Sequence, residues 1–137
     1  MKKNILYFIS FIGIFLIVSL IINFSINSNS ADIGKAYSET NLFENAIELA
    51  NKNKSVIKEF GKIKEVDMLS IAEGNTIYTN NYNTVKSSVR IKSNTKSGKI
   101  DIYATKFDID WHYEEIKIRI KNPKQEIYVI SSNTIKK

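Results

Sequence analysis

The stretch Phe107–Lys121, FDIDWHYEEIKIRIK, decides the fold that the sequence predicts. Its large apolar residues occupy odd positions as far as Tyr113 and even positions from Ile116 onward. Successive side chains of a strand point to opposite faces, so a strand that changes parity must contain a bulge or a turn. We therefore predict a turn near Asp108–Asp110, followed by a strand with an irregularity near Glu114 or the residue after it.

Period-two patterns of β-branched and aromatic residues extend on both sides of this stretch. They predict further strands over Ile63–Ala72, Thr76–Thr79, Thr84–Ser93, Lys99–Lys106 and Gln125–Ser131. Short clusters rich in Asn, Gly and Ser separate these strands and supply turns. The single proline lies in one such turn, Asn122-Pro123-Lys124, where its missing N–H disrupts no strand pairing.

Apolar residues recur at helical spacing before the predicted strands. The stripe at i, i+3, i+4 and i+7 consists of Phe43, Ala46, Ile47 and Ala50. This spacing predicts an amphipathic helix from about Glu39 to Asn51. Asn41, followed by Glu44, resembles a capping box, and Ser38 is an alternative first residue.

A second, shorter helix is expected next. Its cap is Asn53 or Ser55, and Gly61 lies where a residue in the left-handed conformation would end it. The side chains expected to face inward are Val56, Ile57 and Phe60. The predicted fold class of residues 36–132 is therefore α+β, with one or two helices packed on a twisted, mainly antiparallel β-sheet.

A long apolar segment precedes this predicted domain. Ile5–Phe24, ILYFISFIGIFLIVSLIINF, contains no charged residue and includes Phe15 and Leu16 near its centre. About 20 apolar residues match the hydrocarbon thickness of a bilayer, so we predict a transmembrane helix. The alternative is a cleaved signal peptide, whose apolar segment would be only about 7–15 residues long. Small residues at Ser28 and Ser30 leave a cleavage site open.

The charges around the apolar segment predict its orientation. Two lysines lie in the basic start, residues 1–4, and no charged residue follows the segment until Asp32. Positive flanks stay on the cytoplasmic side, so we expect a single-pass protein of the bacterial cytoplasmic (inner) membrane with its C-terminal domain outside. Residues 25–35, rich in Ser and Asn, are predicted to be a flexible spacer, and residues 133–137 a polar tail.

The composition excludes several kinds of chemistry. The chain of 137 residues contains no cysteine, which removes disulfides, thiolate nucleophiles and thiolate metal sites. Lys2 and Lys3 contribute two charges to the net charge of +6, which leaves +4 for the rest of the chain. Such a small positive excess is typical of charge that keeps a protein soluble, and we therefore expect no nucleic-acid partner. We favour a weak attraction of the domain to anionic lipid headgroups.

The single histidine, His112, lies among four carboxylates, Asp108, Asp110, Glu114 and Glu115. A histidine beside a carboxylate could be a general base or a metal ligand, and paired aspartates could hold calcium. Adjacent strand residues point to opposite faces, however, and the acidic series of an EF-hand is missing. We therefore predict no catalytic residue, no metal and no cofactor. An enzyme with His112 in a cleft remains an alternative hypothesis.

Aromatic and basic residues of the predicted strands are candidate contact surfaces. Trp111 and the tyrosines favour core and cross-strand packing over the stacking of a ligand. Two strands carry basic outer faces, formed by Lys86, Arg90 and Lys92 on one strand and by Lys117, Arg119 and Lys121 on another. Such faces are typical of solvated surfaces and could also attract acidic partners.

The order of these helices, strands and turns follows a pattern that extends from about Ala36 to Ser131. Its matching residues are Val56, Phe60, Gly61, Gly98 and Trp111. With the segment Asn53–Gly61, NKSVIKEFG, they make the chain similar to the cytochrome oxidase complex assembly protein one family, which is related to subunit twenty-one of the inner-membrane presequence translocase. The family's glycine after the basic strand is replaced here by Ser93 or Asn94.

The resemblance implies a membrane-tethered α+β domain with helices packed on a twisted antiparallel sheet, and it brings no catalytic residue. Members of the family assist assembly of respiratory or translocation complexes by binding other membrane proteins. We therefore expect a non-enzymatic protein-binding module, a bacterial-type member, whose partners are the lipid bilayer and another membrane protein. The alternative is a small-ligand or lipid-binding domain, with an apolar pocket that opens near Trp111 and is lined by Phe43 or Ile47.

Overall fold

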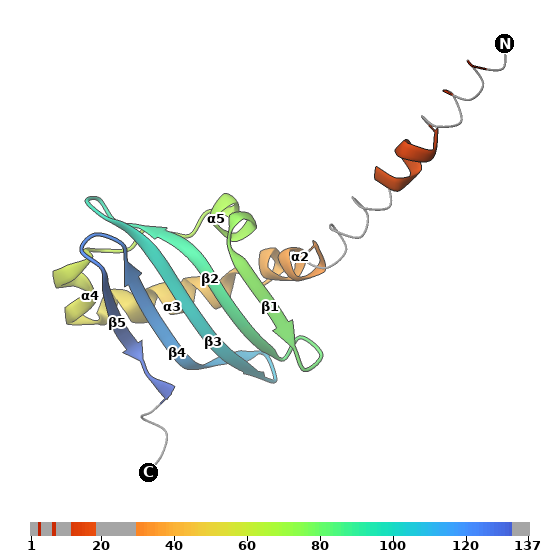
Figure 1. Cartoon of the computed structure of the whole chain (residues 1–137). Helices are drawn as coiled ribbons and strands as arrows, with labels where there is room; N and C mark the ends of the chain where they lie inside the picture. The colour runs from red at the N-terminus through yellow and green to blue at the C-terminus, as the bar shows by residue number, and fades with distance from the viewer. Residues whose placement is uncertain (1–2, 4–6, 8–11, 19–29, 133–137) are drawn as a thin grey trace. The chain divides into compact units, whose positions relative to one another are not determined.

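A computed structural model describes residues 3, 7, 12–18 and 30–132 of the chain (Figure 1). Residues 12–18 are helical and include Phe15 and Leu16, which are 69% and 57% exposed. Among the described residues, no helix is both long enough and apolar enough to span a bilayer. The two ends of the predicted anchor, Ile5 and Phe24, and the predicted polar tail lie outside the described residues.

The chain divides into two compact units, Met1–Ala31 and Asp32–Lys137, and the second unit contains the sheet. One antiparallel sheet runs in chain order through β1 (Asn75–Thr79), β2 (Thr84–Lys92), β3 (Ser97–Phe107), β4 (Asp110–Ile120) and β5 (Gln125–Ile130). From Ser30 onward the helices are α2 (Ser30–Ser38), α3 (Thr40–Lys52), α4 (Lys54–Glu59) and α5 (Met68–Glu73). Helix α3 crosses one face of the sheet (Figure 1), which confirms the predicted α+β class.

The change of parity in β4 is resolved by a bulge at Glu114. Tyr103 of β3 pairs with Glu115, whereas the next residue, Ala104, pairs with Tyr113, so Glu114 is the extra residue. Because of this insertion, Trp111 and the even-numbered isoleucines that follow all face the same core. The predicted irregularity and the predicted turn before β4 are both confirmed.

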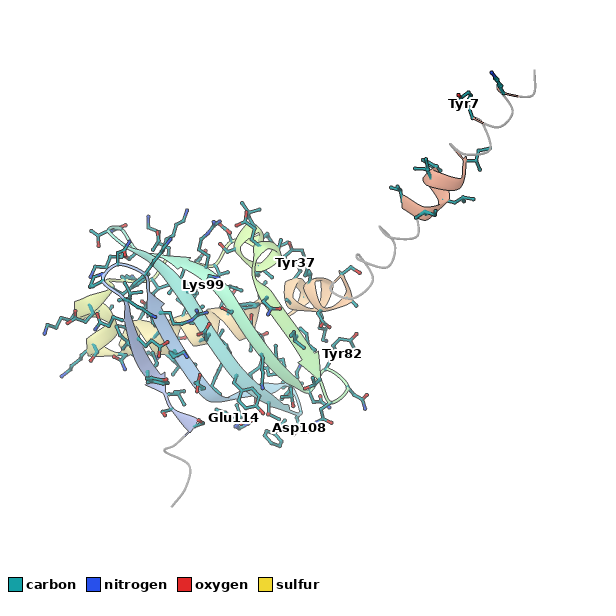
Figure 2. All side chains as sticks on the ribbon, in the orientation of Figure 1. Tyr7, Tyr37, Tyr82, Lys99, Asp108 and Glu114 are labelled. Atoms are coloured by element: carbon teal, nitrogen blue, oxygen red, sulfur yellow. The ribbon has the colours of Figure 1, made fainter. Side chains whose placement is uncertain are left out.

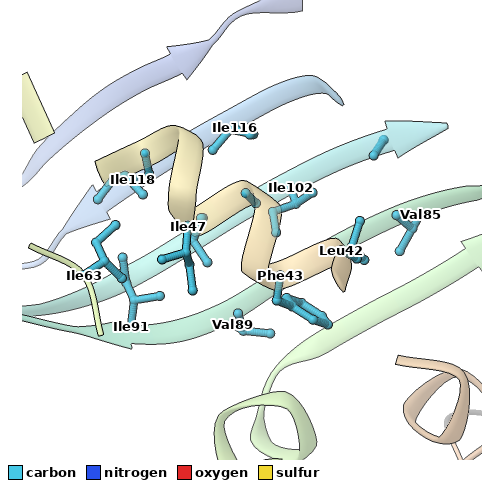
Figure 3. Close-up of a cluster of buried hydrophobic side chains, with 14 of the residues drawn as sticks. Leu42, Phe43, Ile47, Ile63, Val85, Val89, Ile91, Ile102, Ile116 and Ile118 are labelled. Carbon is cyan, nitrogen blue, oxygen red and sulfur yellow. The ribbon is translucent and has the colours of Figure 1, made fainter. Parts of the chain in front are cut away.

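The core lies between α3 and the inner face of the sheet (Figure 3). The predicted helical stripe is buried, and it packs against buried strand residues that include Val85, Val89, Ile91, Ile100, Ile102, Ile116 and Ile118. The hydroxyl of Tyr113 on β4 donates to the carbonyl of Leu42 on α3, with an oxygen–oxygen distance of 2.7 Å. This bond fixes the helix to the strand that carries the bulge.

The predicted strand over Ile63–Ala72 is wrong. Residues 61–67 form no regular element, and α5 follows them. The Asp67 carboxylate accepts from the Ser70 N–H at 2.6 Å and caps α5. The side chain of Asn51 pairs with both the N–H and the carbonyl of Ile63, at 2.8 and 3.1 Å. These backbone groups are therefore satisfied without a neighbouring strand.

The predicted second helix is confirmed as α4, with Asn53 accepting from two backbone N–H groups at its start. Gly61 follows with φ +93°, in the left-handed region that favours glycine. Val56 and Phe60 are buried as expected. The inward orientation predicted for Ile57 is wrong, because its side chain is 44% exposed.

Two predictions near the start of the domain also need correction. Helix α3 begins at Thr40 and its N-cap, Glu39, makes no side-chain capping bond, so neither proposed cap is used. Residues 30–35 of the predicted spacer belong to α2, whereas 25–29 lie outside the described residues. The helix continues through Ala36, which is fully buried, and this packing favours order over a flexible spacer.

Candidate functional site

The outer face of the sheet, which points away from α3, is the candidate functional surface. Its side chains alternate along each strand with those of the core. The charged and aromatic members of this face include Lys86, Arg90, Lys92, Lys99, Asp101, Tyr103, Glu115, Lys117, Arg119, Glu126 and Tyr128. The two basic strand faces predicted from the sequence thus lie on one surface, with β3 between them.

An ion-pair network holds the centre of the outer face. The Arg119 guanidinium donates to both carboxylate oxygens of Asp101, at 2.5 and 2.7 Å, and to the Ser88 hydroxyl at 2.9 Å. Burial would by itself raise the pKa of Asp101, but hydrogen bonds from Arg119 and Ser88 outweigh it and hold that pKa below its usual range. The Asp101 carboxylate raises the pKa of Arg119 in turn. Three strands are joined by this network.

Two cation–π contacts flank the network. The Lys86 ammonium lies 5.2 Å from the centre of the Tyr103 ring, and that of Lys117 lies 5.6 Å from the centre of the Tyr128 ring. Tyr128 is half exposed on β5. Exposed tyrosine and arginine side chains on a rigid sheet are typical of protein–protein contacts.

The two edges of the sheet differ. At the β1 edge, the Tyr78 N–H donates to the Asp32 carboxylate of α2 at 3.4 Å. Strand β5 forms the other edge and, within the part of the chain that the structure describes, pairs with β4 alone. An edge strand offers unpaired backbone donors and acceptors, so β5 can accept a further strand.

A groove of about 450 Å³ lies at the end of the sheet formed by the β2–β3 and β4–β5 turns. We call it the basic groove, and its cationic lining residues are Arg90, Lys99, Arg119, Lys121 and Lys124. Lys99 lies toward this end of the sheet, whereas Asp108 and Glu114 lie toward the opposite end (Figure 2). The structure therefore gathers residues from both predicted basic faces in one place.

Sequence reasoning missed two members of the basic groove, Lys99 and Lys124. Lys99 alternates with the core residue Ile100, and Lys124 lies in the turn that contains the proline. The strand pattern indicates that each is exposed, but only the order of strands in the sheet brings the two together.

A second groove, of about 550 Å³, lies beside α3. We call it the α3 groove, and its apolar lining residues are Phe43, Ile47, Ile63, Val66 and Ile71. Phe43 and Ile47 were the predicted lining of a ligand pocket. Trp111 does not line this groove, so its opening is not where the sequence predicted it. Instead, Trp111 packs against Tyr78, with ring centres 6.4 Å apart. The Lys106 ammonium makes a cation–π contact with the Trp111 ring, 5.3 Å from its centre.

The histidine and its acidic neighbours do not converge in a cleft. His112 is exposed and packs edge-on against the Phe107 ring, with ring centres 5.0 Å apart. Asp108 and Asp110 are exposed, and Glu114 accepts from the Thr105 hydroxyl at 2.7 Å. Within residues 3, 7, 12–18 and 30–132, no three His, Asp or Glu side chains are grouped to hold a metal ion.

The residues that carry the family resemblance occupy structural positions. Val56, Phe60 and Trp111 are buried, and Gly61 adopts a positive φ. A Cβ on Gly98 would meet the Arg119 carbonyl oxygen and the Phe60 ring, so only glycine allows this close approach of β3 to β4. Comparison of the chain with protein-family models, curated proteins and solved structures finds no match.

Proposed function

We propose that the protein is a non-enzymatic, membrane-tethered module that binds another membrane protein through the outer face and the β5 edge of its sheet. The observation that supports this best is the asymmetry of the sheet. Helices pack on one face, the Asp32 carboxylate of α2 accepts one backbone hydrogen bond at the β1 edge, and among the described strands β5 pairs with β4 alone.

The mechanism is strand addition combined with side-chain contacts. A partner segment in an extended conformation pairs with the backbone of β5, and Tyr128 and Arg119 contact the side chains that point to the outer face. Residues 5–24 anchor the chain in the bilayer. Tethering raises the effective concentration of the domain near membrane proteins, so a modest intrinsic affinity suffices. Assistance in the assembly of a respiratory or other membrane complex is the role that the family resemblance favours.

Site-specific photo-crosslinking in intact membranes tests this proposal. A photoreactive residue at Tyr128 on β5 is expected to give a discrete adduct with one membrane protein. The matched control is Thr79, which is also exposed on an edge strand but lies at the β1 edge. The same adducts from both positions, or none from Tyr128, would overturn the proposed surface.

The α3 groove supports a second candidate function, the binding of a small apolar ligand or a lipid chain. Five of its lining residues are apolar, the others are polar or charged, and its volume is of the size found in small-molecule sites. Replacement of Val66, which is half-buried at the groove, by Trp would fill the space and abolish binding of a fluorescent fatty acid. Unchanged binding in Val66→Trp would reject this candidate.

A further inference from the structure

We propose that the basic groove is a binding site for a phosphate group, carried by a phospholipid headgroup or by a soluble phosphate ester. This site lies apart from the α3 groove. It shares Arg119 and the first residues of β5, Gln125 and Glu126, with the proposed protein contact, but it is argued from different observations.

The first observation is uncompensated charge. Lys99, Lys121 and Lys124 line the groove, and none forms an ion pair with a residue in the described part of the chain. Glu126 is the single carboxylate in the lining, and its ion pair at 3.8 Å is with Lys117. Three like charges around a concave surface focus a positive potential, which an anion in the groove would relieve.

The second observation is an unused donor on Arg90. Its Nη2 lies 2.9 Å from a carboxylate oxygen of Glu73 at the end of α5, which holds the side chain in place. Its Nε is buried and has no acceptor among the described residues. A buried donor without an acceptor is unfavourable. An oxygen of a bound phosphate would satisfy it once the Arg90 side chain turns its Nε toward the groove.

The third observation concerns the kind of anion. Arg119 is already engaged with Asp101 through two parallel hydrogen bonds, the arrangement that suits a planar carboxylate. The cations that remain free are ammonium groups on flexible stems, which act as point charges and need no planar partner. A phosphate group, with a charge of about −1 to −2 and several acceptor oxygens, suits them better than a carboxylate does.

The test uses the full chain in uncharged detergent micelles. Inorganic phosphate is titrated first, glycerol phosphate second, and in a third arm the micelles contain an anionic phospholipid. Chemical shifts of the Arg90 Nε–H and of the lysine ammonium groups report binding at the site. Binding in any arm, with the Arg90 Nε–H among the shifted signals, supports the proposal. Shifts only with the phospholipid identify a headgroup as the source, and shifts with the soluble compounds identify a free ester.

A pair of matched double variants separates the site from general charge. Lys121→Ala/Lys124→Ala is expected to weaken phosphate binding by at least about tenfold, because each lysine near the anion contributes on the order of 1 kcal/mol. Lys54→Ala/Lys58→Ala removes two exposed lysines of α4 outside the groove and is expected to change binding less than about twofold.

Equal losses in both double variants, or no binding in any arm, would overturn the proposal. Arg90→Lys supplies an independent check, because it keeps the charge and removes Nε. It is expected to weaken binding by about ten- to a hundredfold, the effect of one charge-assisted hydrogen bond. Unchanged affinity in Arg90→Lys would reject the role assigned to that donor. The adduct formed from Tyr128 is a separate measurement, so each proposal can fail alone.

Discussion

At the residue scale, Asn51 connects α3 to the irregular segment after α4. Its amide oxygen accepts from the Ile63 N–H at 2.8 Å, and its amide nitrogen donates to the Ile63 carbonyl at 3.1 Å. The pair of bonds copies the pattern that a neighbouring strand would supply. A single side chain thus positions Ile63, whose own side chain is buried in the core.

Asn51→Ala is therefore expected to lower the free energy of unfolding by about 1–3 kcal/mol, because it leaves two partly buried backbone groups of Ile63 without partners. Denaturation with urea measures this change. Asn45→Ala, an exposed position on the same helix, is the control and should change the free energy by less than about 0.5 kcal/mol. Equal effects of the two substitutions would contradict the role of Asn51.

The lowered pKa of Asp101 makes the free energy of unfolding depend on pH in the acidic range. Its pKa is lowered in the folded protein, because hydrogen bonds from Arg119 and Ser88 outweigh the effect of burial. The folded state is therefore stabilised above the unfolded-state pKa, about 3.9, and this stabilisation is lost as the pH falls through the lower, folded-state pKa. Wild-type protein should lose stability in this acidic range.

Asp101→Asn should be less stable than wild type at pH 7, by about 1–3 kcal/mol, and its stability should fall less steeply below about pH 4. Urea denaturation at a series of pH values measures both effects. Asp108→Asn, at an exposed position without an ion pair to any described residue, should stay within about 0.5 kcal/mol of wild type at pH 7. Parallel pH profiles for wild type and Asp101→Asn would refute this prediction.

At the element scale, the bulge in β4 reconciles two hydrophobic patterns. Deletion of Glu114 would restore regular pairing and turn either Trp111 or the isoleucines from Ile116 onward to the wrong face. We expect a loss of several kcal/mol or a failure to fold, since a large apolar side chain contributes about 1.5–3 kcal/mol when buried.

Glu114→Ala is the matched control for the deletion. It keeps the number of residues in β4 and removes only the hydrogen bond from the Thr105 hydroxyl, so it should cost about 0.5–1.5 kcal/mol. Circular dichroism and thermal unfolding compare the two variants. A deletion variant as stable as Glu114→Ala would show that the bulge does not set the register.

The elements also show where prediction from the sequence works. The strands β2 to β5 and the helix α3 follow from alternation or helical spacing, which are properties of short segments. The error at Ile63–Ala72 has a different origin. The Asn51 side chain that satisfies the backbone of Ile63 comes from a distant helix, and the short capped helix α5 has too few turns for a clear periodic signal.

At the scale of the whole molecule, the buried core of the described residues begins at Ala36 and extends through the sheet. A chain that starts at residue 30 is therefore expected to unfold with the same free energy as the full chain, within about 0.5 kcal/mol. Urea denaturation in uncharged detergent compares the two chains. A large loss of stability would mean that the first residues contribute to the fold.

The predicted anchor leads to a second expectation for the whole chain. Full-length protein should stay with the membrane after alkaline extraction, whereas a chain that starts at residue 30 should be released, because about 20 apolar residues suffice to span a bilayer. Sequencing of the mature N-terminus serves as the control for cleavage. Release of the full-length protein, or removal of its first residues during export, would contradict the tether.

The sequence by itself determined the α+β class, the alternation of the strands, the bulge near Glu114 and the left-handed residue at Gly61, because each depends on neighbours a few residues apart. Tertiary structure alone decided where Arg90, Lys99 and Lys124 meet. They come from two strands and a turn, and only the order and register of the strands set their separation in space. Local patterns predict which side chains are exposed, whereas long-range pairing decides which exposed charges share a groove.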